Sequence, residues 1–337
     1  MDIDLKVLKA IESDRGIAFN ELVEIIEAAI LAAYYRSQDI HIKRDEVDFT
    51  RAELDRKSGA VKIFTRDKDE EGNAVGEERD VTPENFGRIA ASSAKQVITQ
   101  RLRAINDESL LGEFNSKVGD VVIGTIQQDT NRHLIKIDLG ALEGILPPEE
   151  QVVGEEYVHG KRIRVIITKV DRARNGGTQV TVSRRHKMLV RKLFALEVPE
   201  IASGQVEIMQ VAREAGHRTK IAVRSTIDGL NAKGACIGPM GARVRAVSAE
   251  LNEEKIDIVD YDEDIKKFVA SALSPAKISS TFTIPSKDPD GRPHVRALVP
   301  DYQLSLAIGK EGQNAKLAAD LTGAKIDIQP ESILEGE

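Results

Sequence analysis

Two short glycine loops are the part of this sequence whose residue types and spacing point most directly to chemistry. Residues 238–241 read GPMG and residues 309–312 read GKEG. Glycine has no Cβ, so such a loop lets the backbone approach a phosphate closely and adopt positive φ. A helix that begins directly after the loop adds unpaired N–H groups and the positive end of its dipole. The pattern therefore predicts a site for a ligand that carries phosphate.

The sequence around the loops makes the pattern specific. A GxxG pair alone is weak evidence, because 25 glycines in 337 residues produce such pairs by chance. Here, however, each pair follows an apolar residue and an isoleucine, precedes a helical stretch and leads to the strand sequence KIDI, at 255–258 and 325–328. The loop glycines are 71 residues apart and the KIDI strands 70, so one deletion aligns the two copies as an internal repeat.

The elements that must position each loop follow one order: helix, strand, strand, helix, GxxG, helix, strand. Two β-rich runs precede each loop, at 206–211 with 219–223 and at 280–284 with 295–299. This order is typical of a KH domain of the bacterial type, which clamps about four nucleotides of single-stranded RNA. The alternative is that each GxxG merely turns the chain between two packed helices.

The connection between the two copies is short. After the first KIDI strand, a helical run at 265–273 already begins the second copy, and no flexible linker fits between them. We therefore expect one rigid platform, on which both loops contact one continuous RNA strand and gain effective concentration. The RNA-binding residues predicted in the two copies are Gly238, Pro239, Met240, Gly241, Arg243 and Arg245, and Gly309, Lys310, Glu311, Gly312, Asn314 and Lys316.

The middle of the chain has the pattern of a small β-barrel. Short apolar runs at 121–126, 134–137, 163–167 and 180–182 are separated by Gly, Asp, Asn and Pro. The series resembles the S1-type OB-fold, whose strand face binds RNA. A barrel that only spaces its neighbours is the alternative. The RNA-contact residues predicted here are His133, Lys136, Arg162 and Arg164.

The first third is acidic and differs in pattern. Residues 1–112 hold 17 Lys+Arg and 23 Asp+Glu, which accounts for nearly all of the net charge of −7 and favours a protein-docking role. Apolar spacing predicts an amphipathic helix over 19–33. β-Rich runs at 47–54 and 60–65 flank a turn at 56–59, and 67–76 reads as a charged loop. Thr82 reads as an N-cap, followed by Pro83 and a helix of roughly 25 residues to Leu110.

Composition argues against several other classes of protein. The lone cysteine, Cys236, excludes an internal disulfide and a cysteine-based zinc site, and we read it as a packing residue. The acids at 260, 262 and 264 lack the glycine and glutamate of a calcium loop and read as a helix N-terminus. We found no Walker, Rossmann or nucleophile-elbow motif. We therefore expect no metal, no cofactor and no catalytic activity.

The same data predict the organisation of the chain. No apolar run approaches the roughly 18 residues needed to span a bilayer, so we expect a cytoplasmic protein. We also expect it to be a monomer. The fold class is α+β multidomain: an N-terminal α/β unit with a long helix, an S1-type OB-fold barrel and two tandem type II KH domains. The expected domains are the N-terminal unit at 1–112, the barrel at 113–184, the first KH domain at 185–260 and the second KH domain at 261–337.

These motifs resemble the NusA family of bacterial transcription factors. Segments 193–201 (LFALEVPEI), 234–238 (GACIG) and 254–259 (EKIDIV) are similar to its first KH domain, and 307–318 (AIGKEGQNAKLA) to its second. The order of domains also matches. The resemblance implies that the N-terminal unit binds core RNA polymerase and that the barrel and KH domains bind nascent single-stranded RNA, including ribosomal RNA leaders. It implies a role in pausing, intrinsic termination and antitermination, together with other Nus factors.

Two other classes share some of these modules. Exoribonucleases such as polynucleotide phosphorylase carry a KH domain and an S1-type barrel, but in the opposite order and with a large phosphorolytic core. A ribosome-associated RNA chaperone is the third possibility. Phosphate-dependent RNA degradation would favour the first of these, and association with ribosomal subunits the second.

Overall fold

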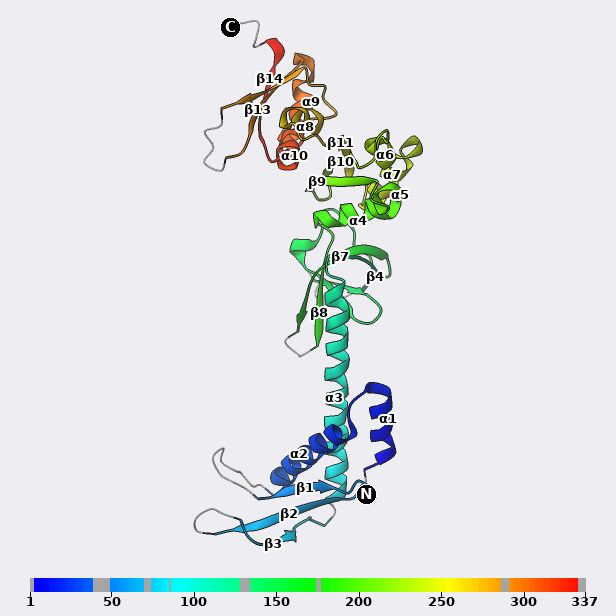
Figure 1. The fold of residues 1–337 in the computed structure, drawn as a ribbon, viewed down its shortest axis with the longest axis vertical. Coiled ribbons are helices and arrows are strands. Elements are labelled where there is room, and N and C mark those ends of the chain that lie inside the picture. Colours follow the sequence, from blue (N-terminus) through cyan, green and yellow to red (C-terminus); the bar gives the residue numbers. More distant parts are fainter. Residues whose placement is uncertain are drawn as a thin grey trace. The chain divides into compact units, whose positions relative to one another are not determined.

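The computed structural model describes residues 3–38, 49–69, 74–84, 86–127, 134–173, 177–285 and 291–332. The chain divides into two compact units, Met1–Ser109 and Leu110–Glu337 (Figure 1). No helix within these described ranges is both long and apolar enough to cross a membrane.

The first unit packs helices against a small antiparallel sheet in the order β1-β2-β3. Residues 19–33 form the predicted helix, because their apolar spacing places several side chains on one face that can be buried. The buried residues are Leu22, Val23, Ile26, Ile30 and Ala33. The elements are α1 (Leu5–Arg15), α2 (Phe19–Ser37), β1 (Arg51–Leu54), β2 (Val61–Lys68), β3 (Ala74–Asp80) and α3 (Gly87–Ser116).

Two expectations for this unit were wrong. The charged stretch 67–76 is not simply a loop, since β2 runs on to Lys68 and β3 begins at Ala74. The pairing of β2 with β3 is supported by an ion pair between Asp67 on β2 and Arg79 on β3. Residues 70–73 of the charged stretch and residues 47–48 of the predicted first strand lie outside the described residues.

The start of the long helix was also misplaced. The Thr82 hydroxyl accepts a hydrogen bond from the Ile63 backbone N–H at 2.8 Å, so Thr82 fastens the connection to β2 and caps no helix. The helix α3 begins at Gly87 and continues to Ser116. Its last turns lie in the second unit, where Phe114 is buried in the core of the barrel and Leu110 packs against it.

The barrel of the second unit is closed in the order β4-β5-β6-β8-β7. Alternate apolar side chains point inward, and Ile126, Ile137, Val165 and Val182 form part of its core. This confirms the predicted small barrel and its strand positions. The strands are β4 (Val121–Gln127), β5 (Ile135–Asp138), β6 (Glu143–Leu146), β7 (Arg162–Arg172) and β8 (Thr178–Ser183).

Both copies of the repeat have the predicted KH topology. Each three-stranded sheet combines one antiparallel and one parallel pair, in the orders β9-β10-β11 and β12-β13-β14, with helices against it. The first copy contains α4 (Lys187–Glu197), α5 (Pro199–Ala202), β9 (Val206–Glu214), β10 (Arg218–Ser225), α6 (Ala232–Ile237), α7 (Ala242–Glu250) and β11 (Lys255–Asp260). The second contains α8 (Ile265–Ala272), β12 (Ser280–Ile284), β13 (His294–Val299), α9 (Leu304–Ile308), α10 (Gln313–Thr322) and β14 (Lys325–Pro330).

The two KH modules share one hydrophobic core. Ala212, Ala222 and Val259 of the first module belong to the same buried cluster as Phe268 and Val295 of the second. At the other end of the first module, the buried Arg184 pairs with Glu155 of the barrel and donates to the Glu250 carbonyl at 2.7 Å. Buried contacts of this kind leave no room for a flexible linker at either junction.

Candidate RNA-binding surface

The two GxxG loops adopt the same backbone conformation. Gly238 and Gly309 have φ of 73° and 78°, and the third residues of the loops, Met240 and Glu311, have φ of 49° and 53°. Each loop leads directly into a helix of nine or ten residues, α7 or α10. Met240 is 93% exposed, so the loop interior faces solvent. The structure thus presents two equivalent, exposed loops with helix N-termini behind them, as a phosphate backbone requires.

Asn314 has a different place from the one predicted. Its side chain is fully buried and its amide donates to the carbonyls of Leu273 at 3.0 Å and Ala307 at 2.9 Å. A Cβ on Gly309 would lie only 2.8 Å from the Asn314 Cβ, so glycine is required here by close packing as well as by φ. Asn314 therefore holds the second loop in place and is not available to RNA.

Arg243 has the corresponding role in the first module. Its guanidinium donates to Glu200 at 2.8 Å and to the Ala235 carbonyl at 2.7 Å, which ties α7 to the helix before the loop. This partly buried side chain is occupied by internal partners, contrary to its predicted role as a phosphate contact. Arg245, Lys310 and Lys316 are exposed, and they supply positive charge near the loops.

The barrel candidates divide in the same way. Arg164 pairs with Glu250 of the first KH module at 2.5 Å, and Lys136 lies 3.5 Å from Glu143. Arg162 is exposed, and it lines with Ile123, Arg164 and Glu250 a cleft of about 240 Å³ between β7 and α7. His133 lies outside the described residues.

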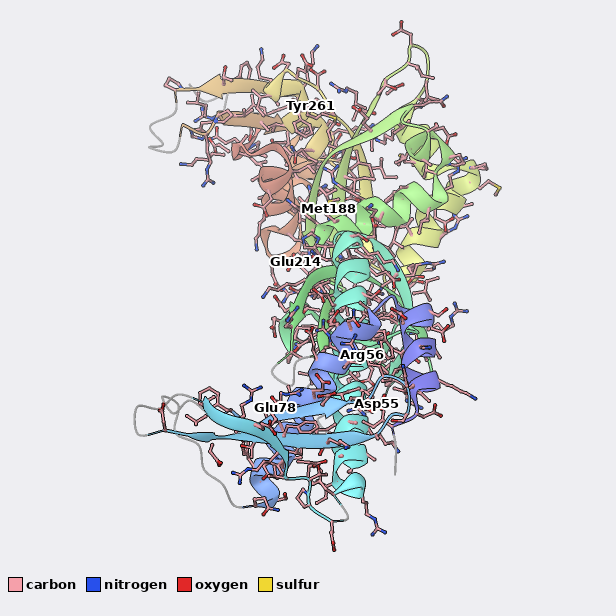
Figure 2. All side chains as sticks on the ribbon, turned by 60° about the horizontal axis from the view of Figure 1, so that its bottom comes forward. Asp55, Arg56, Glu78, Met188, Glu214 and Tyr261 are labelled. Atoms are coloured by element: carbon pink, nitrogen blue, oxygen red, sulfur yellow. The ribbon has the colours of Figure 1, made fainter. Side chains whose placement is uncertain are left out.

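A larger cleft, which the sequence did not reveal, lies where the second loop meets the first module. Its volume is about 630 Å³. One wall is the β9–β10 turn, which begins at Glu214 (labelled in Figure 2), and the other is the GKEG loop with the start of α10. The Gln313 side chain donates to Glu214 at 2.9 Å across the junction. The lining residues are Glu214, Gly216, His217, Lys310, Glu311, Gln313 and Lys316.

Two smaller predictions are confirmed. Burial raises the pKa of the Cys236 thiol to about 11, and the side chain is fully inaccessible, as expected for a packing residue. The Asp264 side chain accepts a hydrogen bond from the Lys266 N–H at 3.0 Å and so caps the N-terminus of α8.

Across the described parts of the chain, no group of three or more His, Cys, Asp or Glu side chains is arranged to hold a metal ion.

Known families match most of the chain. The NusA N-terminal domain matches residues 5–72 and 66–108, the NusA-like first KH domain residues 184–261, and the NusA-like second KH domain residues 265–335. The transcription termination/antitermination protein NusA of Mycobacterium tuberculosis is 54% identical over 336 residues, which cover 98% of this chain and 93% of that protein. Its counterpart in Bacillus subtilis is 41% identical over 350 residues, covering 97% and 91%.

A solved structure gives a local match as well. The solution structure of the N-terminal domain of NusA from Bacillus subtilis is 34% identical, with a TM-score of 0.23, and covers 29% of this chain and 92% of that one. The predicted fold class is confirmed, since the N-terminal domain and two KH domains match and the strands between them form a closed barrel. KH domains are RNA-binding modules. The chain belongs to the NusA family of transcription termination/antitermination proteins.

Proposed function

We propose that this protein is a transcription elongation factor that binds core RNA polymerase through residues 1–112 and nascent single-stranded RNA through residues 113–337. In this role it modulates pausing, intrinsic termination and antitermination. The observation that supports the RNA-binding role most directly is the pair of exposed GxxG loops with the same left-handed geometry, mounted on modules that share a buried core.

The loops act chiefly through shape. The first loop interior is uncharged and the second carries Lys310 beside Glu311, so the backbone N–H groups and helix ends contribute more to phosphate binding than side-chain charge does. Arg245 and Lys316 add attraction at a distance. Each module clamps about four nucleotides. Because the modules are fixed to one another, a strand held by one loop is presented to the other at high effective concentration.

The domain roles follow from charge and position. The acidic N-terminal unit docks on polymerase, and the barrel (113–184) and KH domains (185–260 and 261–337) receive the emerging transcript. Arg162 and Lys136 mark the barrel surface that contacts RNA. The NusA relatives are named for transcription termination and antitermination. This chain is proposed to act likewise, as a monomer, with other Nus factors on ribosomal RNA leaders.

A binding experiment tests the proposal. The full chain is titrated against fluorescent RNA of about twelve nucleotides and against a blunt duplex of the same sequence. We expect clear preference for the single strand, since KH grooves read splayed bases. If about four to six phosphates are neutralised, the log–log salt slope is about −3 to −4. Equal affinity for the duplex would refute the KH mechanism.

The polymerase role needs its own assay. Residues 1–112 are tested for co-purification with core RNA polymerase, and residues 113–337 serve as the comparison. The first unit has its own hydrophobic core, built from α1, α2, the sheet and α3, so we expect the fragment to fold. Retention of polymerase by the C-terminal fragment alone would overturn the assignment.

A further inference from the structure

The outer face of each KH sheet is the face that points away from the helices of the same module. In the first module this face is covered, because α8 and α10 of the second module pack against its strands (Figure 1). Its side chains Ala212, Ala222 and Val259 belong to the core that the two modules share. The sheet of the second module has the same strand order, so it has an outer face of the same construction.

One row of side chains corresponds between the two outer faces. Each row has a cation on the central strand, an aspartate from the repeated KIDI segment on the parallel strand, and an apolar side chain on the antiparallel strand. The rows are Ala212, Lys220 and Asp257 in the first module, and Phe282, Arg296 and Asp327 in the second. The cation pairs with the aspartate in both rows, at 3.0 Å in the first and at 2.9 Å in the second.

The two rows differ in exposure. Lys220 in the first row is fully buried. In the second row, Phe282 is 50% exposed, and the side chains of Arg296 and Asp327 are 42% and 33% exposed. A half-exposed phenylalanine beside a half-exposed ion pair marks a part of the face that has no cover, although the same row is covered in the first module.

The neighbours of Phe282 define this open part. Thr281, the preceding residue on β12, donates a hydrogen bond to the Lys266 carbonyl of α8 at 3.2 Å. Successive side chains of a strand point to opposite faces, so Phe282 points away from α8, to the outer face. Leu298, one row further along the same face, is buried. The open part is therefore centred on the row of Phe282 and on the row beyond it, which contains Lys325.

The covered face shows what such a row binds. The Lys220 ammonium donates to the Ser274 carbonyl at 2.7 Å, just beyond the end of α8. The last carbonyls of a helix have no partner within the helix and carry the negative end of its dipole. Arg296 has the place of Lys220 in the second row, and among the described residues only its Nε is hydrogen-bonded, to Asp327. Its two Nη groups can therefore receive the C-terminal end of a helix.

The chemistry of the open face favours an acidic helix. Among the described side chains on the outer face of β12, β13 and β14, Arg296 and Lys325 are cations and Asp327 is the one anion. This balance attracts a partner of negative charge. A second copy of this chain cannot supply the helix from α8 or α10, since both already lie between two sheets. The strands of about six residues span about 20 Å, which a helix of about 13 residues matches.

We propose that the outer face of the second KH sheet is a docking site for an acidic amphipathic helix of a partner protein. The apolar stripe of that helix covers Phe282, its C-terminal carbonyls accept hydrogen bonds from Arg296, and its acidic side chains lie near Lys325. The site is built like the one that the second module itself occupies on the first. None of its residues belongs to a GxxG loop, so docking leaves RNA binding unchanged.

Photo-crosslinking of the full-length protein tests this site. The photoreactive amino acid p-benzoylphenylalanine replaces Phe282 in one variant and Thr283 in the matched control. Both variants are irradiated in the cells in which this chain naturally occurs, and the crosslinked segment is identified by mass spectrometry. Thr283 is exposed on the same strand but points to the opposite face of the sheet.

A synthetic peptide of the captured segment is then titrated against the wild type and three variants: Phe282→Ala, Arg296→Gln and the control Thr283→Ala. We expect a protein crosslink from position 282 and none from 283, within an acidic amphipathic segment whose peptide gains helical circular dichroism on binding. Phe282→Ala should lower the affinity for the peptide about tenfold or more, the scale of an aromatic anchor. Arg296→Gln should lower it about threefold to tenfold. Thr283→Ala should bind like the wild type.

Several results would overturn the proposal. These are equal crosslinking from both positions, no crosslink from position 282, a crosslink from 282 to RNA, and a captured peptide that binds without becoming helical. Wild-type peptide affinity in both Phe282→Ala and Arg296→Gln would overturn it too. If Phe282→Ala fails to fold, Arg296→Gln decides by itself. The proposed function is judged separately, by the affinity of the wild type for single-stranded RNA, which all folded variants should share.

Discussion

The buried amide of Asn314 offers the sharpest test of how the second RNA loop is held. Replacing Asn314 with leucine keeps a side chain of similar size but removes both donors, to Leu273 at 3.0 Å and to Ala307 at 2.9 Å. Both carbonyls then lose a donor, although the Leu273 carbonyl still accepts from the Ala276 N–H at 3.2 Å. Each such loss in a buried place costs up to about 1–3 kcal/mol. The side-chain oxygen of Asn314, Oδ1, is itself buried without a hydrogen-bond partner. Its removal and the added apolar contact of leucine therefore offset part of the lost stability.

The net expectation is a loss of about 2 kcal/mol in the free energy of unfolding of the second unit. For a unit of this size, about 2 kcal/mol lowers Tm by roughly 4–8 °C. Differential scanning calorimetry measures the shift. Gln210→Leu is the control, since it removes an exposed amide from the same unit and should leave Tm unchanged.

Binding of long RNA should weaken too, measured well below the lowered Tm, because the loop loses its anchor. A Tm within 1 °C of the wild type would refute the reasoning. In that case the two hydrogen bonds add nothing beyond what water or a rearranged backbone can supply.

Three further predictions follow from the structure. Met240→Asp and, separately, Lys310→Asp should each lower RNA affinity about tenfold without affecting the fold, because a carboxylate meets the incoming phosphate at an exposed loop. Burial lowers the pKa of Lys220 from 10.5 to about 8. At a pH between these two pKa values, Lys220 is protonated in the unfolded chain but not in the folded one. The free energy of unfolding therefore rises with pH over this range. Urea titrations from pH 7.5 to 10 should show this rise, by up to about 3 kcal/mol, in the wild type and not in Lys220→Met. The buried thiol of Cys236, with a pKa of about 11, should resist iodoacetamide in the native protein and react in urea.

Each of these has a clear contrary result. If both loop variants keep wild-type RNA affinity and melt normally, the loops are simple turns. RNA binding would then be assigned to the barrel around Lys136 and Arg162. Parallel pH profiles for the wild type and Lys220→Met would mean that the lysine titrates alike in the folded and unfolded states. Rapid alkylation of native Cys236 would show that the core of the first KH module opens readily.

The sequence by itself determined the modules of this protein. These modules follow from local patterns: the apolar spacing over 19–33, the alternation in the barrel strands, and the repeated GxxG and KIDI segments. Each helix or strand forms because its own residues suit that type of secondary structure. The weakest local patterns failed. Both ends of the charged stretch 67–76 belong to strands, and Asp67 pairs with Arg79 on the neighbouring strand. Thr82 accepts a hydrogen bond from β2 instead of capping a helix.

Only the tertiary structure decided which polar side chains face RNA. Asn314 and Lys316 lie on one helix beside one loop, yet Asn314 is buried and Lys316 exposed. The difference arises because Leu273, 41 residues earlier in sequence, places a carbonyl against Asn314. In the same way, the cleft where the second loop meets the first KH module brings together Glu214 and Gln313, which are 99 residues apart in sequence. Contacts over such distances depend on how finished elements pack together, and no local pattern of residues encodes them.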